Sequence, residues 1–580
     1  MQVQVQTAGQ TRTENASLSA VRVVDSVQPN KRRDTSADRP LWYRHATRGA
    51  AKSAPLAVLV AGAVSVVQRI DLYTHSTIFP YDAYYYLGTA QSLAYGLGYQ
   101  WRGLPHTRFF PGYPIFVALL SPSVGLEYAS VLVAAASWAL VGLVAYGIAA
   151  KVAGRAAGLV AGLLTVYHPL AAVWTSVPMS EGFFTLACFL SLFLAVRAVS
   201  MRSWRYIVLA SASAGIAVAT RGEGVLLYPL LAACVAFLWK QTSKSAKQAR
   251  KLALATAVSV VLSIGPLVLW CVWQLSHPSQ QVSYLSELQQ GLEPSLSFVM
   301  SRAWYYLFPA FGQTVITVAG YAGLVLALKR DKPTVAILAS WLALLAGFHS
   351  FWYYRYDRFA LAAVPVLCVG CGAVARAVLD LGKRLAERAA EQATRARQSP
   401  VAAYVALGMA LIVAAVALQS AELGNSRARL HMALLGDNGG DALVIAAKTA
   451  GKLEGNLASN AGAIVEYHSG KPTLDLVAPI SKETLSLLPK AERPCAVAIG
   501  CYDPDQAGHG SPEQRLAKLE SSSVRYLVLA LGGNEPRGIV RALGLPPERF
   551  EVVAMVGQLD KKQRTARRAA VLRLVPPTRQ

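Results

Sequence analysis

Long apolar runs recur through the first three quarters of the chain, and short polar connections separate them. Since a membrane-spanning helix needs about 20 mainly apolar residues, the pattern predicts a polytopic α-helical membrane protein of about eleven spans. The predicted spans are 54–70, 127–150, 156–176, 181–198, 205–220, 223–239, 252–275, 303–328, 333–350, 358–379 and 400–420. The stretch 112–125 is apolar but short and broken by proline, so we expect a helix lying at the membrane interface.

The pattern changes on both sides of this region. Residues 1–52 are polar and rich in arginine, which predicts a basic, disordered arm on the cytoplasmic side. Residues 421–580 are mixed polar sequence in which β-rich runs (495–500, 524–531, 550–556, 569–575) alternate with helical patterns near 437–452, 512–521 and 536–544. This alternation predicts a small α/β domain. The expected domains are therefore 1–52, a transmembrane domain 53–420 whose first outer loop is 71–126, and 421–580.

Charge assigns sides to the predicted spans. The chain is 54% hydrophobic and 15% charged with a net charge of +24, whereas a soluble protein has about a quarter of its residues charged. Lysine and arginine concentrate in the connections 151–155, 197–205, 240–251, 329–332 and 376–397, which the positive-inside rule explains better than nucleic-acid binding. We expect a multi-pass plasma-membrane protein, most simply of the bacterial inner membrane, with its N-terminus cytoplasmic and residues 421–580 outside.

A few charged residues fall on the predicted outer side, against this pattern. Ionisable groups at membrane depth are costly and usually mark function. Asp82 lies among six tyrosines in 78-IFPYDAYYYLGTAQSLAYGLGYQ-100, just after the first span. The others are His106, Arg108, Glu181, Arg221, Glu223, Arg355 and Arg358.

Each of these residues also has a purely structural interpretation. Asp82 and Glu181 could cap the helices that follow them. Arg221 could pair locally with Glu223, and the two arginines of 351-FWYYRYDRFALAAVP-365 could be interfacial anchors. Taken singly none of these residues is a strong signal. Their joint occurrence on one side of the membrane favours a site.

The chemistry that suits such a set is transfer from a lipid-linked phosphosugar. A carboxylate can act as general base on an acceptor hydroxyl that attacks the anomeric carbon. Arginines can hold the leaving phosphate and stabilise its developing charge. Tyrosine and tryptophan rings can pack against sugar and lipid.

The order of these segments resembles the GT-C superfamily of integral-membrane glycosyltransferases, in particular the protein O-mannosyltransferase-like and aminoarabinose-transferase-like branch. The resemblance covers roughly residues 54 to 375. It rests on Asp82 in the first outer loop, 111-PGYPIFVALL-120, Glu181 at the fourth span, 220-TRGEGVLLYP-229 and 353-YYRYDRFALAAVP-365. Many such enzymes have two adjacent acids in the first loop, whereas Ala83 follows Asp82 here, so the acceptor is left open. The WWDYG-type signature of oligosaccharyltransferases is absent.

The resemblance implies an inverting enzyme that moves a monosaccharide from a polyprenyl-phosphate donor to a lipid, glycan or protein acceptor at the outer face. It implies Asp82 as the catalytic base, with Arg355 and either Arg358 or Arg221 at the donor phosphate. The residues expected to line the cavity are His106, Arg108, Glu181, Glu223, Tyr85 and Tyr354.

Other interpretations stay open at this point. No cofactor is firmly implied, although one acid with His106 nearby leaves room for a divalent cation. Cys495 and Cys501 could form a disulfide if the outer compartment is oxidising. A transporter or lipid flippase would also be polytopic with a few buried charges, but it should show mid-span charges, internal repeats or broken helix pairs. No clear repeat is found, and the charges cluster at the outer ends of the predicted spans. A non-catalytic scaffold presenting the outer domain is the third alternative.

Overall fold

The structure is a computed structural model. It describes residues 41–74, 79–101, 103–242, 245–277, 296–351, 356–392, 422–424, 426, 441–471, 473–476, 512–531, 535–543, 545–557 and 568–576. The predicted span 400–420, the predicted strand 495–500 and the cysteine pair 495/501 lie outside these ranges.

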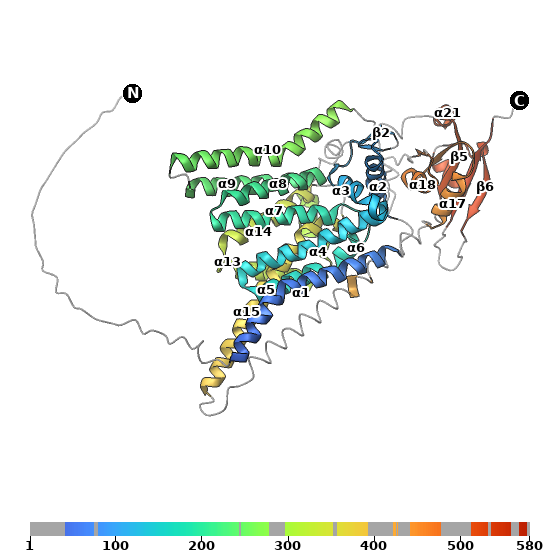
Figure 1. The fold of residues 1–580 in the computed structure, drawn as a ribbon. Coiled ribbons are helices and arrows are strands. Elements are labelled where there is room, and N and C mark those ends of the chain that lie inside the picture. The colour runs from blue at the N-terminus through green and yellow to red at the C-terminus, as the bar shows by residue number, and fades with distance from the viewer. Residues whose placement is uncertain are drawn as a thin grey trace, which may run out of the picture. The chain divides into compact units, whose positions relative to one another are not determined.

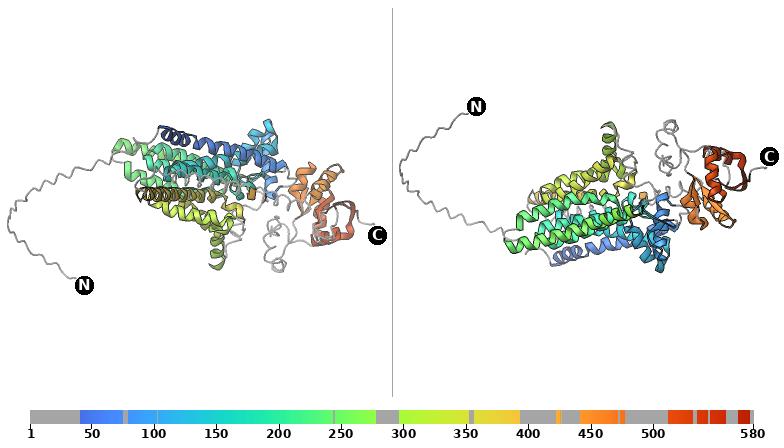
Figure 2. Two further views of the ribbon diagram at one scale, coloured as in Figure 1. Left: turned by 90° about the horizontal axis from the view of Figure 1, so that it is seen from below. Right: turned by 90° about the horizontal axis from the view of Figure 1, so that it is seen from above.

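Long helices run side by side in all three views of the chain (Figures 1 and 2). Among the described residues, seven helices are long and apolar enough to cross a membrane. They are Ser53–Thr74 within α1 (Leu41–Thr74), α4 (Leu126–Ala153), α7 (Glu181–Met201), Gly222–Gln241 comprising η1 (Gly222–Leu226) and most of α9 (Leu227–Thr242), α10 (Ala246–Ser276), α14 (Lys332–Ser350), and Asp357–Arg384 comprising η3 (Asp357–Ala363) and most of α15 (Val364–Gln392).

Three predicted spans are shorter or broken. The region 156–176 forms α5 (Arg155–Val166) and the short α6 (Pro169–Trp174), and 205–220 forms α8 (Trp204–Thr220). The eighth predicted span, 303–328, is broken. The helix formed by α12 (Leu296–Leu307) and η2 (Pro309–Phe311) is bent by 107° relative to α13 (Thr314–Leu328). Counting that bent pair as one span gives up to eight among the described residues, by length and composition. The helical membrane fold is therefore confirmed. The count of about eleven stays a prediction, because the predicted span 400–420 lies outside the described residues and α5 and α8 are shorter than this criterion requires.

Small residues allow the helices to approach closely. A Cβ atom on Gly323 of α13 would lie 1.8 Å from the carbonyl oxygen of Gly370 in α15, and one on Gly182 would lie 2.4 Å from the carbonyl oxygen of Ala134 in α4. Backbone contact of this kind is typical of helix packing within membranes, where apolar burial contributes little. The Gly182 contact sets the position of α7 at its first turn, beside Glu181.

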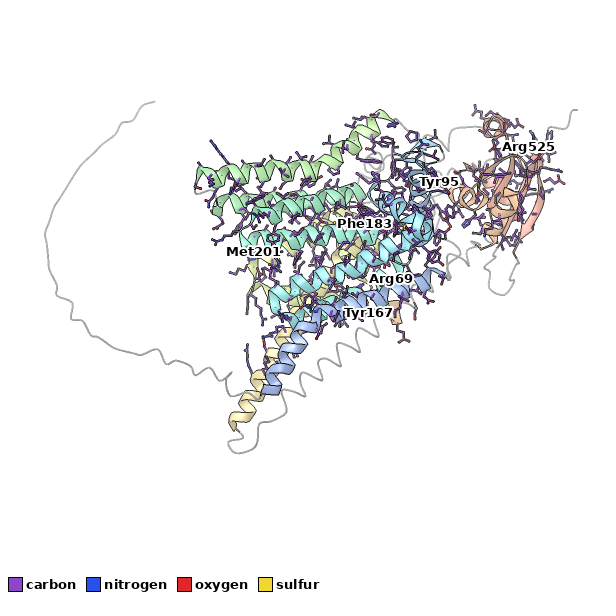
Figure 3. The ribbon with its side chains drawn as sticks, viewed as in Figure 1. Arg69, Tyr95, Tyr167, Phe183, Met201 and Arg525 are labelled. Carbon is purple, nitrogen blue, oxygen red and sulfur yellow. The ribbon has the colours of Figure 1, made fainter. Side chains whose placement is uncertain are left out.

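The predicted first outer loop is a compact structure. It contains α2 (Tyr81–Ala94), an antiparallel pair β1 (Gln100–Trp101) and β2 (Leu104–Pro105), and α3 (Gly112–Val124). The helix α3 occupies the stretch expected to lie at the interface, and α2 packs against it. Figure 3 labels Tyr95, which follows α2, together with Phe183 and Met201 near the two ends of α7; Phe183 lies toward Tyr95, and Met201 lies at the far end of the helix.

The C-terminal region contains a small α/β sheet, as expected. Strands β3 (Asn456–Ser459), β4 (Thr473–Asp475), β5 (Val524–Ala530), β6 (Phe550–Val556) and β7 (Ala569–Leu574) form one sheet in the order β4-β3-β5-β7-β6. Strand β3 is parallel to its neighbours β4 and β5, and β7 is antiparallel to β5 and β6. The accompanying helices are α17 (Asp441–Gly451), α18 (Gly462–Ser469), α21 (Pro512–Ser521) and α22 (Pro536–Ala542). Sequence analysis missed β3, β4 and α18, which are short.

Candidate active site

Five charged side chains from four separate segments form one connected cluster. Asp82 comes from the first turn of α2, Glu181 opens α7, Arg221 and Glu223 flank the start of η1, and Arg358 comes from η3. These residues are as far apart as 82 and 358 in the sequence. We call this set the charged cluster.

The capping interpretations of the two acids are wrong. Pro80 occupies the cap position of α2 and Ser180 that of α7, and neither helix has a side-chain cap hydrogen bond. Asp82 and Glu181 lie instead within the first turns, where a negative charge interacts favourably with the helix dipole. Their carboxylates are thus available to the arginines. The local pairing of Arg221 with Glu223 is confirmed.

Two arginines link the three carboxylates. Arg358 Nη2 donates to Asp82 Oδ2 at 2.8 Å, and its Nε lies 3.8 Å from Glu181 Oε1. Arg221 Nη1 donates to the same Glu181 oxygen at 2.9 Å, while its Nη2 donates to Glu223 Oε1 at 2.8 Å. The cluster therefore alternates in sign from Asp82 through Arg358, Glu181 and Arg221 to Glu223.

The first two members of the cluster are more exposed than the other three. The side chain of Asp82 is 24% exposed and that of Arg358 13%, whereas Arg221, Glu223 and Glu181 are 8%, 5% and 3% exposed. Only the first pair is accessible enough to touch a substrate directly. The other three residues lie behind it, and they are accommodated in the interior because opposite charges pair there.

The electrostatic environment keeps Asp82 ionised. Burial alone would raise the pKa of its carboxyl group, but the guanidinium groups of Arg358, Arg108 and Arg221 together hold that pKa below its ordinary value. A carboxylate can accept a proton only in its ionised form, so Asp82 is in the state that a general base requires.

Aromatic rings surround both guanidinium groups. The Arg358 guanidinium lies 5.7 Å from the ring centroid of Trp174, 5.0 Å from that of Tyr356 and 5.3 Å from that of Phe359. The Arg221 guanidinium lies 5.6 Å from the Phe359 ring. Rings at this range attract cations and exclude water, which strengthens the ion pairs.

Comparison with known proteins agrees with this architecture. Residues 115–270 match the sequence model of the dolichyl-phosphate-mannose-protein mannosyltransferase family. The fold is similar to that of ArnT from Cupriavidus metallidurans, solved with bound undecaprenyl phosphate, at 17% identity and a TM-score of 0.55, with 89% of this chain and 97% of ArnT covered. It is also similar to the archaeal oligosaccharyltransferase AglB from Archaeoglobus fulgidus, at 15% identity and a TM-score of 0.53, with 82% of this chain and 69% of AglB covered. A search of curated protein sequences found no match.

The matched segment and the similar fold agree with the resemblance to the GT-C superfamily of integral-membrane glycosyltransferases that the motifs indicated. The charged cluster lies between the predicted first outer loop, which carries Asp82, and the segments at the ends of the long helices.

The remaining predicted site residues are placed differently. Arg355 and Tyr354 lie outside the described residues. Arg108 is close enough to Asp82 to affect its pKa, and its guanidinium lies 5.5 Å from the Phe109 ring centroid. Arg108 is thus associated with the cluster through its charge.

His106 and Tyr85 pack within the first loop. His106 Nε2 accepts a hydrogen bond from the Phe109 amide at 3.1 Å, and its ring lies 5.8 Å from Tyr85 and 5.5 Å from Tyr99 between centroids. Burial, together with the charge of Arg108, lowers the pKa of His106 to about 3, so the ring is neutral near pH 7. This placement favours a structural role for both residues, and their predicted place in the cavity stays a prediction.

Sequence analysis overlooked three neighbours of the cluster. Tyr86, one helical turn after Asp82, accepts a hydrogen bond from Ser180 Oγ at 3.0 Å, and the i, i+4 spacing could have indicated it. Trp174 and His349 lie in apolar runs that offer no such signal. Trp174 Nε1 donates to Asp357 Oδ1 at 3.1 Å, and the buried His349 stacks on Phe359 with 4.8 Å between ring centroids.

Nothing in the described ranges resembles a metal centre of three or more His, Cys, Asp or Glu side chains. The divalent cation considered from the sequence stays an untested prediction.

Proposed function

We propose that this chain is an inverting glycosyltransferase of the GT-C type that moves a monosaccharide from a polyprenyl-phosphate donor to a hydroxyl group of a lipid, glycan or protein acceptor. The observation that carries the proposal is the 2.8 Å contact between the Asp82 carboxylate and the Arg358 guanidinium, the most exposed pair of the charged cluster. It brings a general base and an anion-binding group to one point, and sugar transfer from a phosphate needs both.

Arg358 is the proposed ligand of the donor phosphate. A guanidinium group can bind two phosphate oxygens with parallel hydrogen bonds. Its Nε is buried, has no hydrogen-bond partner among the described residues, and lies 3.8 Å from Glu181 Oε1. The charge developing on the leaving phosphate would strengthen its interaction with Arg358, which lowers the barrier. Arg355 stays a second candidate for this role.

Arg221 is assigned a supporting role in this proposal. Its two terminal nitrogens already bind Glu181 and Glu223 at 2.9 and 2.8 Å, and its side chain is more buried than that of Arg358. A donor phosphate would have to compete with two carboxylates for it. We infer that Arg221 acts on the donor indirectly, because it neutralises the carboxylate of Glu181 that would otherwise draw Arg358 inward.

Donor binding is proposed to activate the base. In the free protein Arg358 lowers the pKa of Asp82 and so weakens it as a proton acceptor. A donor phosphate would share Arg358 with Asp82 and bring negative charge close to the carboxylate. Both changes raise the pKa of Asp82. The base therefore becomes effective only after the donor has bound, which protects the donor from unproductive hydrolysis.

The proposed transfer is a single displacement. The acceptor oxygen forms a bond to the anomeric carbon while its proton passes to the Asp82 carboxylate. The bond between the anomeric carbon and the phosphate oxygen breaks, and the polyprenyl phosphate leaves with the electron pair. Attack opposite the leaving group inverts the anomeric configuration. The proton then leaves Asp82 for water when the product dissociates.

The reaction is proposed to take place at the outer membrane face. The cluster lies toward the end of α7 at which Phe183 is found, and the other end of that helix, at Met201, leads into a basic connection (Figure 3). Basic connections tend to remain in the cytoplasm. On the same reasoning, the domain 421–580 is proposed to lie outside and the arm 1–52 inside.

The experiment that tests the function is sugar transfer by the full chain in lipid nanodiscs. Labelled polyprenyl-phosphate monosaccharides would be supplied with membrane extracts as acceptors. We expect transfer by the wild type, and a 10²- to 10⁴-fold lower kcat for Asp82→Asn because general-base catalysis is lost. The control is Asp71→Asn, which neutralises an exposed acid at the end of α1.

Two results would contradict the proposal. Transfer by Asp82→Asn at the wild-type rate would remove Asp82 as the base. No transfer by the wild type with any donor would remove the glycosyltransferase activity itself, and would favour a transporter or a scaffold.

A further inference from the structure

A helix of the C-terminal domain packs against the helix that carries Asp82. Helix α18 contacts α2 through Tyr84, which is fully buried. The Tyr84 ring lies 5.4 Å from the Tyr467 ring and 5.8 Å from the His468 ring between centroids, in edge-to-face geometry in both cases. Aromatic contacts of this kind are directional as well as apolar, so they restrain the orientation of α2.

A chain of hydrogen bonds leads from this contact to the turn before Asp82. The Phe79 amide donates to the Tyr84 hydroxyl oxygen at 3.2 Å, and the Tyr84 hydroxyl group lies 3.4 Å from His468 Nε2. Because the hydroxyl oxygen accepts from Phe79, its own hydrogen is free to point to His468. Burial lowers the pKa of His468 to about 4, although Glu127 opposes this shift. The ring is therefore neutral near pH 7 and can accept through Nε2.

A second connection links α18 to the chain before Asp82, at Tyr73. Glu127, in the first turn of α4, accepts hydrogen bonds from Tyr73 near the end of α1 and from Tyr467 of α18. Hydrogen bonds to an ionised carboxylate are stronger than those between neutral groups. Asp82 lies between Tyr73 and Tyr84 in the sequence. Helix α18 contacts Tyr84 directly, and it is linked to Tyr73 through the carboxylate of Glu127.

We propose that the C-terminal domain positions Asp82, with Tyr467 and His468 as the positioning residues. The inference rests on the proposed function, because it takes Asp82 as the base. Displacing a catalytic group by about 1 Å can lower the rate 10²-fold. Asp82 is the second residue of α2, so its own helix supplies few neighbours on its N-terminal side and contacts from other elements must help to fix its position. Helix α18 supplies such contacts through Tyr84.

The first readout is hydrogen exchange over residues 79–86 in the full chain, which requires no activity. His468→Ala removes the acceptor and opens a space beside Tyr84, so we expect amide exchange in this segment to become about tenfold faster. His468→Gln keeps an acceptor oxygen and should recover part of the protection. Tyr95→Phe, which alters an exposed tyrosine at the end of α2, should leave the exchange unchanged.

The second readout separates positioning from binding. If α18 positions the base, His468→Ala should lower kcat about 5- to 30-fold and leave the donor KM within twofold, because Arg358 is intact. Tyr467→Phe, which loses only a hydroxyl group, should have a smaller effect in the same direction. This milder variant keeps the test valid if His468→Ala does not fold.

The inference is overturned if exchange over 79–86 is unchanged in both His468→Ala and Tyr467→Phe. It is also overturned if exchange increases while kcat stays at the wild-type value, because the contact would then be structural only. An absence of transfer by the wild type would instead contradict the proposed function, and the exchange data would still report whether α18 orders the segment around Asp82.

Discussion

Arg221 neutralises two buried carboxylates, and its removal is the most demanding test of the charged cluster. Arg221→Gln would leave Glu181 and Glu223, at 3% and 5% side-chain exposure, without their partner at 2.9 and 2.8 Å. Breaking a buried ion pair in this way costs about 3–5 kcal/mol. The loss is large because the remaining charges keep their desolvation cost and lose the attraction that offset it.

The same reasoning predicts partial recovery in a double variant. Arg221→Gln combined with Glu223→Gln removes one of the two uncompensated charges, so it should be more stable than Arg221→Gln alone. Transfer should remain impaired, because Glu181 still lies 3.8 Å from Arg358 Nε and would attract that arginine away from Asp82. The double variant should therefore recover part of the free energy of unfolding without recovering sugar transfer.

The assay is unfolding of the full chain in a mild detergent, followed by tryptophan fluorescence, with sugar transfer measured in parallel. Arg205→Gln is the matched control, since Arg205 lies exposed near the start of α8. It should change the free energy of unfolding by less than about 0.5 kcal/mol. The reasoning is refuted if Arg221→Gln is as stable as this control, or if the double variant is less stable than Arg221→Gln.

Three further predictions follow from the same geometry. Arg358→Gln removes a charge that lowers the pKa of Asp82, so the acid limb of the pH profile of kcat/KM should move to higher pH. If the acid limb stays at the wild-type pH, Asp82 is excluded as the titrating group. His106 has a pKa of about 3 in the folded protein and about 6.5 in the unfolded chain. The free energy of unfolding should therefore fall by up to about 1.4 kcal/mol per pH unit as the pH drops from 6.5 toward 3. His106→Gln should flatten that dependence in a thermal unfolding series. In a cysteine-free background, Tyr95→Cys should react with an impermeant thiol reagent from outside intact cells and Met201→Cys only after permeabilisation; the reverse would invert the proposed topology.

The hydrophobic pattern predicted the helical membrane fold well, because a span is a local property. Enough consecutive apolar residues satisfy the length requirement whatever the rest of the chain does. The same pattern could not show that the region 303–328 belongs to a pair of helices bent by 107°, since the bend depends on the packing around Pro309 and Gly312. Short strands such as β3 were also missed, because four residues are too few to show the alternation of apolar and polar positions that indicates a strand.

The sequence by itself determined which ionisable groups are present near the ends of the spans that are predicted to face outward, among them Asp82, Glu181, Arg221, Glu223 and Arg358. It could do so because charges are rare in apolar sequence and stand out. Apart from the local pair of Arg221 and Glu223, which of them pair was decided only by the tertiary structure. Local capping was the natural expectation for Asp82, yet its carboxylate binds Arg358, a residue 276 positions away. An ion pair depends on the distance between two atoms, and the packing of α2, α7 and η3 sets that distance.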